Sequence, residues 1–146
     1  MLNEKLNIKG DVVLVLTDEN GNLKQRQEIK NLVVTTGLDY ISDKMVSSAT
    51  TVSHMAIGTN NLAPAASQTA LLAELDRNAF TTSSSSNGVC TFNAQWAAGD
   101  GTGAIAEAGI FAGSSGGTML CRTTFDTVNK AAGDSLAITW VVTISV

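Results

Sequence analysis

Short β-type segments separated by turn-forming residues fill the second half of this 146-residue sequence and constrain its fold more than any other feature. In the last of these segments, large apolar residues such as Leu136, Ile138 and Trp140 alternate with smaller or more polar residues. A strict period of two is typical of a strand that turns one face toward a core. Four strands are predicted in this half, at Val89 to Ala97, Ile105 to Ala112, Met119 to Val128 and Asp134 to Val146.

The first half opens with a predicted hairpin. Its first strand, Ile8 to Thr17, contains an unbroken apolar run that favours burial on both faces. Its second strand is Leu23 to Val34. Asn20-Gly21 lies between the two strands, and Asn-Gly is a strong hairpin signal because both residues tolerate a positive φ.

One amphipathic helix is predicted, at about 37–47. Thr36 and Asp39 have the spacing of a capping box at its start. Leu38, Ile41 and Met45 fall on one helical face, which we expect to pack against a sheet.

The segments after the helix complete the predicted fold. They are a strand at Val52 to Gly58, a loop at Thr59 to Gln68, a helical turn at Thr69 to Glu74, extended structure at Arg77 to Thr82 and a loop tip at Ser83 to Gly88. The spacing of Glu74 and Arg77 predicts a helical ion pair three residues apart. Together these elements predict an all-β fold, a two-layer antiparallel β-sandwich, jelly-roll-like, with one short α-helix.

Composition narrows the class of protein. The length suits an N-terminal arm at 1–9 and a single domain at 10–146, large enough to fold without a metal or a disulfide. Only 15% of the residues are charged, against roughly 25% in a typical soluble domain, which favours a surface partly covered by neighbouring subunits. The net charge of −4 argues against nucleic acid as a partner. Without the apolar segment of a signal peptide or a membrane span, the chain is expected to be made in the cytoplasm and to have no membrane partner.

The residues that could carry chemistry are scattered. Cys90, Cys121 and His54 lack the spacing of a zinc site, so free thiols and no bound metal are expected. The Gly-rich turns at 99–103 and 113–117 lack the lysine of a phosphate-binding loop, which argues against a nucleotide cofactor. No serine stands in a nucleophile elbow. The sequence therefore predicts a non-catalytic protein without a cofactor.

Glu107 is the one charged residue of an otherwise apolar strand, where an unpaired charge would be costly. If 113–117 forms the loop of a hairpin, the residues opposite Glu107 fall at about 122 or 123. We therefore predict a structural ion pair between Glu107 and Arg122. We prefer this pair to a glycosidase-type pairing of carboxylates among Glu74, Glu107 and Asp126.

A series of short segments extends, in a fixed order, over nearly the whole chain. The segments are Gly10 to Leu16, Lys30 to Val34, His54 to Thr59, Thr69 to Leu71 with Glu74 and Arg77, Glu107 to Phe111, Gly117 to Arg122 and Gly133 to Trp140. This ordered series resembles small virion structural proteins of tailed bacteriophages. The resemblance implies either a capsid decoration (cement) protein or a tail-fibre or baseplate component.

The absence of long repeats and heptads, which a fibre shaft would show, favours the cement protein. We expect a homotrimer on the outer capsid surface of the virion, bound to the major capsid protein through its N-terminal arm, sandwich edges and loops. Binding only the assembled lattice would stabilise the head by mass action. The alternative is a tail-fibre or baseplate module that binds host glycans, with an exposed Trp96 or loop residues as a sugar platform. The candidate interface residues are Met1, Leu2, Leu6, Ile8, Lys24 and Arg26.

Overall fold

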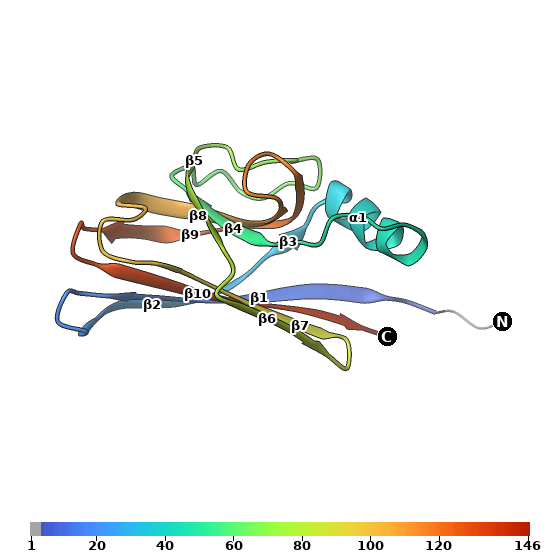
Figure 1. Ribbon diagram of the computed structural model, residues 1–146, viewed down its shortest axis with the longest axis horizontal. Helices are drawn as coiled ribbons and strands as arrows, with labels where there is room; N and C mark the ends of the chain where they lie inside the picture. Colours follow the sequence, from blue (N-terminus) through green and yellow to red (C-terminus); the bar gives the residue numbers. More distant parts are fainter. Residues whose placement is uncertain (1–3) are drawn as a thin grey trace.

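Two five-stranded antiparallel sheets stack face to face in the computed structural model, which describes residues 4–146 (Figure 1). The first sheet has the order β2 (Leu23–Lys30), β1 (Asn7–Thr17), β10 (Ser135–Ser145), β7 (Val89–Trp96) and β6 (Thr82–Ser86). The second has the order β3 (Leu32–Val33), β9 (Thr118–Lys130), β8 (Gly103–Ala112), β4 (His54–Gly58) and β5 (Glu74–Ala79). One helix, α1 (Thr35–Val46), lies beside the second sheet. The predicted all-β sandwich with one short helix is confirmed.

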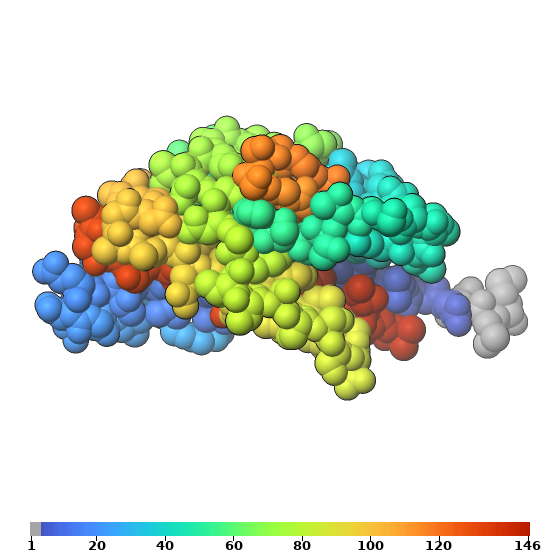
Figure 2. Space-filling view, in the orientation of Figure 1, coloured from blue at the N-terminus to red at the C-terminus, as the bar shows by residue number. Residues whose placement is uncertain are grey.

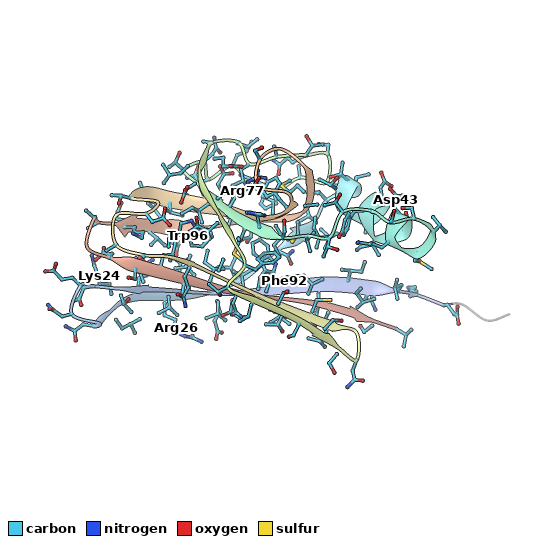
Figure 3. All side chains as sticks on the ribbon, in the orientation of Figure 1. Lys24, Arg26, Asp43, Arg77, Phe92 and Trp96 are labelled. Carbon is cyan, nitrogen blue, oxygen red and sulfur yellow. The ribbon has the colours of Figure 1, made fainter. Side chains whose placement is uncertain are left out.

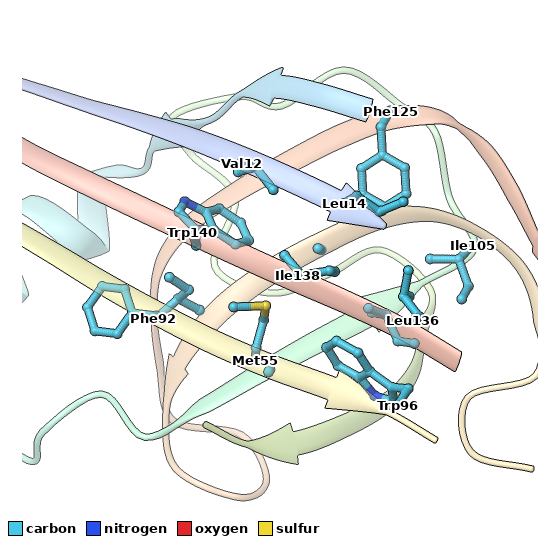
Figure 4. Packing of buried hydrophobic residues seen from close by; sticks show 14 of the residues in the cluster. Val12, Leu14, Met55, Phe92, Trp96, Ile105, Phe125, Leu136, Ile138 and Trp140 are labelled. Atoms are coloured by element: carbon cyan, nitrogen blue, oxygen red, sulfur yellow. The ribbon is translucent and has the colours of Figure 1, made fainter. Parts of the chain in front are cut away.

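The core lies between the inner faces of the two sheets (Figure 4). In β10, Leu136, Ile138 and Trp140 are buried and the residues between them are half-buried, as the period of two predicts. In β1, only one face is buried: Leu14 is in the core, whereas Val13 and Val15 on the outer face are half-buried. The expected burial of β1 on both faces is wrong, because no third layer covers this sheet within residues 4–146.

The chain changes sheets at Asn31, within the segment predicted as one strand from Leu23 to Val34. β2 ends at Lys30 in the first sheet, and β3 begins at Leu32 in the second. The side chain of Asn31 lies directly on Gly10, where a Cβ atom would come within 1.5 Å of Asn31 Oδ1. Gly10 is therefore needed for the chain to cross between the sheets at this point.

Helix α1 packs through a face that shares only Ile41 with the predicted one. Leu38 and Met45 are 49% and 82% exposed, whereas Tyr40 and Ile41 pack against the core. Gly37 is the only buried residue of the helix, and a Cβ there would lie 2.0 Å from Leu120 O. This close approach of the helix backbone to β9 decides which face turns inward, against the apolar pattern of the sequence.

The predicted capping box does not form. Val34 precedes the helix and makes no side-chain cap, and Thr36 Oγ1 instead donates a hydrogen bond to Met119 O at 3.1 Å. The helix is thereby fixed to β9 through its first turn.

Two further local predictions are wrong. The predicted loop tip at Ser83 to Gly88 is mostly strand, because β6 pairs with β7 through Ser86 and only Asn87-Gly88 turns, with φ of 52° and 78°. Positive φ at both central residues is the geometry of a tight hairpin, which Asn-Gly satisfies. The predicted helical turn at Thr69 to Glu74 is absent; Glu74 opens β5.

The start of β1 and the end of β10 lie at the end of the sandwich that carries α1 (Figure 1). β1 begins at Asn7, which pairs with Ser145, and runs beside β10 along its whole length. β3 pairs with β9 in the other sheet. This pairing of the first strands with the last ones is the jelly-roll-like element of the fold. Ile8 and Lys9, which fall within the predicted arm at 1–9, belong to β1 and to the sandwich.

Candidate functional site

Glu107 and Arg122 form a fully buried ion pair on β8 and β9. Arg122 donates from Nε and Nη2 to Glu107 Oε2 at 3.0 and 2.7 Å, and neither side chain is exposed to solvent. In the strand register, Glu107 lies opposite Thr124, and Arg122 lies opposite Gly109, so the two residues meet diagonally. A charge-assisted bond of this kind is strong only if the remaining polar atoms of both groups are also satisfied.

Those remaining atoms bind the loop that covers the second sheet, residues 59–73. Glu107 Oε1 accepts a hydrogen bond from the backbone of Ala73 at 2.7 Å, and Glu107 Oε2 accepts one from Leu72 at 3.1 Å. Arg122 Nη1 donates to Leu62 O at 2.8 Å and to Gln68 Oε1 at 3.1 Å. The buried pair therefore holds both halves of the loop against the sheet.

The loop closes on itself at Gly58. Thr59 donates its backbone N–H to Ala73 O at 3.0 Å, so the two ends of the loop lie side by side as in a compact Ω-loop. A Cβ on Gly58 would lie 2.4 Å from Glu107 Oε1 and 2.5 Å from Ala73 O. A glycine is needed at this position for the ion pair and the loop ends to meet.

The outer surface of the loop is uncharged and includes exposed leucines. No Asp, Glu, Lys or Arg occurs from Thr59 to Ala73. Leu62 is 61% exposed and Leu72 is 43% exposed, and Leu75 at the start of β5 is 40% exposed. In Figure 2 this segment, coloured green to lime, lies at the top of the molecule, above the second sheet. We call the surface formed by Leu62, Leu72 and Leu75 the loop surface.

Arg77 fixes the turn beside the loop surface. It donates to Gly113 O at 3.1 Å, to Gly116 O at 2.8 Å and to Glu74 Oε1 at 2.6 Å (Figure 3). Its guanidinium group lies 3.8 Å from the centre of the Phe111 ring. The predicted contact between Glu74 and Arg77 is present, but it lies on strand β5 and not in a helical turn.

The predicted interface residues do not form one surface. Leu6 is 66% exposed at the α1 end of the molecule, and Ile8 is half-buried in β1 against the core. Figure 3 shows Lys24 at the opposite end from Asp43 of α1. Arg26 lies on β2 and pairs with Glu28 at 2.9 Å. Met1 and Leu2 lie outside the described residues.

Lys24 is bound within the fold. Its Nζ donates to Asp134 Oδ2 at 2.6 Å, and this hydrogen bond is the main cause of a lowered pKa at Asp134. The side chain of Lys24 therefore fixes the turn before β10, which limits its availability to a partner.

A carboxylate pair that the sequence reasoning missed lies between β5 and the turn after β7. Burial and then a hydrogen bond to Asp100 raise the pKa of Asp76. Asn78 donates to Asp100 Oδ2 at 2.7 Å, and this bond is the main cause of the lowered pKa of Asp100. The opposite directions of the two pKa shifts mean that Asp76 holds its proton more strongly than Asp100 does. The two residues are 24 positions apart in sequence, and they meet because β5 of the second sheet approaches the end of β7 in the first sheet.

The other candidates for chemistry take structural positions. Trp96 is fully buried in the core, so the expected sugar platform is not on the surface (Figure 4). His54 Nδ1 lies 2.7 Å from Ser53 Oγ. Cys90 and Cys121 are free thiols, and burial raises the pKa of Cys121. Among residues 4–146 no cluster of His, Cys, Asp or Glu could hold a metal ion, and no described helix is long and apolar enough to span a membrane.

No family model, curated protein or solved structure matches this chain.

Proposed function

We propose that this protein is a non-catalytic structural subunit of a tailed-phage virion, a capsid decoration (cement) protein that binds the outer surface of the major capsid protein lattice. The observation that carries the proposal is the loop surface. It is a charge-free segment with exposed leucines, held by a buried ion pair to the central strands of a sheet.

The loop surface has the properties of a protein-binding surface. Interface centres are depleted in charged residues, and contiguous exposed apolar side chains mark sites of association. Because Glu107 and Arg122 bind the loop on both sides, little conformational entropy remains to be lost on binding. A rigid apolar surface on a small sandwich suits a subunit that clamps neighbouring capsid proteins together.

The proposal of a head location rests on the resemblance and on this surface. A subunit that binds the assembled lattice and not its free components stabilises that lattice in proportion to its occupancy. The tail-module alternative used either an exposed Trp96 or loop residues as a sugar platform, and Trp96 lies in the core. The interior position of Trp96 removes the aromatic platform from that alternative and leaves the loop residues as its only basis.

The test uses expanded capsids from a virion that lacks this protein. Purified protein should co-sediment with the capsids and raise their temperature of disassembly. Leu62→Asp and Leu72→Asp should each weaken binding about tenfold or more, because each places a charge where an apolar side chain is buried on binding. Leu23→Asp is the matched control, since Leu23 is 62% exposed on the β1–β2 hairpin.

Electron cryo-microscopy of complete virions gives the location. Density on the capsid shell, reduced by the loop variants, supports the proposal. Density on the tail, or undiminished binding of Leu62→Asp and Leu72→Asp to capsids, overturns it.

A further inference from the structure

An apolar groove of about 360 Å³ lies between α1 and the inner face of the first sheet. Tyr40 and Ile41 of α1 and Val52 line one side, and Phe92 and Ile144 are among the sheet residues that line the other. Serines of β6 form its rim, and no charged residue lines it. At this end of the sandwich, the strands of the first sheet extend beneath α1 beyond the second sheet (Figure 1). The groove is thus a stretch of the core face of the first sheet that α1, residues 51–52 and Leu120 cover only in part.

The N-terminal segment leaves the fold beside this groove. Ile8 pairs with Ile144, which lines the groove, and Asn7 pairs with Ser145. Leu6, which precedes β1, is apolar, and 66% of it is exposed to solvent. An extended segment of six residues, Met1 to Leu6, spans about 20 Å, which is enough to reach a neighbouring molecule.

The described chain before β1 leads away from the groove. In Figure 1 the dark blue trace of residues 4–6 continues outward past α1, along the direction of β1, and does not fold back over the groove. A groove on a second copy is therefore the better match for this segment than the groove of the same chain.

The chemistry of the segment fits the groove. Leu2 and Leu6 are four residues apart, so they share one face of an extended chain, with Glu4 between them. Lys44 stands at the groove, because its Nζ lies 3.2 Å from Oγ1 of Thr51, a lining residue. The two leucines match the apolar lining, and Glu4 and Lys44 are complementary in charge.

The edge of the first sheet offers backbone partners as well. Within residues 4–146, β6 pairs with β7 alone, so its outer edge has free N–H and C=O groups. An extended peptide can add to such an edge and place alternate side chains in an adjacent groove. We propose that residues 1–6 of one copy bind in the groove of a second copy, beside β6. This contact joins copies of the chain and is independent of what the loop surface binds.

Two variants test the two sides of the contact in the free protein, without capsids. Leu6→Asp alters the arm, and Ser85→Arg obstructs the groove at an exposed rim position. In analytical ultracentrifugation, wild-type protein should associate with rising concentration, and each variant should weaken association about tenfold or more. Leu23→Asp, at the opposite end, should associate like the wild type. A mixture of Leu6→Asp and Ser85→Arg should form one-to-one complexes, because one variant keeps the groove and the other keeps the arm.

Alkylation of Cys90, which lines the groove, reports directly on its occupancy. Cys121 is fully buried, so native protein should react at Cys90 alone. The reaction should slow with increasing concentration of wild type but not of Leu6→Asp. Association that is unaffected by Leu6→Asp overturns the proposal. A wild-type protein that stays monomeric at every concentration also overturns the proposal, even if the arm protects Cys90 within its own chain. Because no capsid is present, either result is separate from the test of the loop surface.

Discussion

Arg122 meets Glu107 across a diagonal, since Arg122 lies opposite Gly109, and Glu107 lies opposite Thr124, in the β8–β9 register. In this arrangement Glu107 Oε2 binds the guanidinium group, and Oε1 remains free to accept the backbone N–H of Ala73. One buried carboxylate therefore joins two strands and a loop.

Glu107→Gln should destabilise the protein strongly, because it leaves Arg122 as an uncompensated buried charge. The expected loss is about 3–5 kcal/mol of unfolding free energy, measured by urea denaturation. Glu28→Gln is the control, since the Arg26–Glu28 pair is mostly exposed and should contribute little. An unchanged denaturation midpoint for Glu107→Gln would contradict the structural role of the pair.

Gly37→Ala should destabilise the fold even though alanine is the better helix former. The gain in helix propensity is about 1 kcal/mol, whereas the new Cβ would lie 2.0 Å from Leu120 O and force the helix away from β9. Overpacking of this kind costs about 1–3 kcal/mol of unfolding free energy. The shift of the helix backbone adds to this cost. Ser42→Ala, on the exposed side of α1, should leave the melting temperature nearly unchanged. A higher melting temperature for Gly37→Ala would show that the helix does not lie this close to the strand.

The stability of the protein should depend on pH through Asp76. Its pKa is raised above 3.8 in the folded state, mainly by burial. The stability linked to its protonated form is fully present below pH 3.8 and is lost as pH rises through the raised pKa. Asp76→Asn should therefore gain stability relative to the wild type as pH rises from acid toward neutral. Denaturation at several pH values measures this difference, and parallel profiles would contradict the raised pKa of Asp76.

Asp134 should make the stability of the protein depend on pH in the opposite direction to Asp76. The hydrogen bond from Lys24 lowers its pKa below 3.8, so the stabilisation is present above that pH and is lost as pH falls through the lowered pKa. Lys24→Met should remove much of this acid sensitivity. Lys9→Met should keep it, because Lys9 is exposed and remote from Asp134 along β1. Acid titration followed by tryptophan fluorescence compares the three proteins. Equal acid midpoints for Lys24→Met and the wild type would contradict this role of Lys24.

The sequence alone predicts those structural features that follow from one local pattern of residues. The alternation from Leu136 onward predicts β10 and its buried face. The isolated charge of Glu107 on an apolar strand requires a partner, and hairpin spacing points to Arg122. Both inferences use residues that are close in sequence or that belong to one hairpin.

The remaining features depend on contacts between distant segments. The crossing at Asn31 needs the bare backbone of Gly10, and the inward face of α1 is set by the approach of Gly37 to Leu120. The serine run of β6 has weak strand propensity and is a strand because β7 pairs with it. The role of Glu107 in holding the loop through Leu72 and Ala73 is likewise invisible in the sequence.

The position of β10 has a consequence for biosynthesis. This strand joins β1 to β7 and carries Trp140 into the centre of the core, yet it comes last in chain order among the described strands of the sandwich. Until β10 is synthesised, β1 lacks its main neighbour, and the apolar sides of β1 and β7 stay exposed. Strand pairing over so long a sequence separation slows folding, and it prolongs the lifetime of aggregation-prone intermediates. A nascent chain halted before Ser135 should therefore be a substrate for chaperones, and the addition of β10 should be the event that commits the sandwich to its native form.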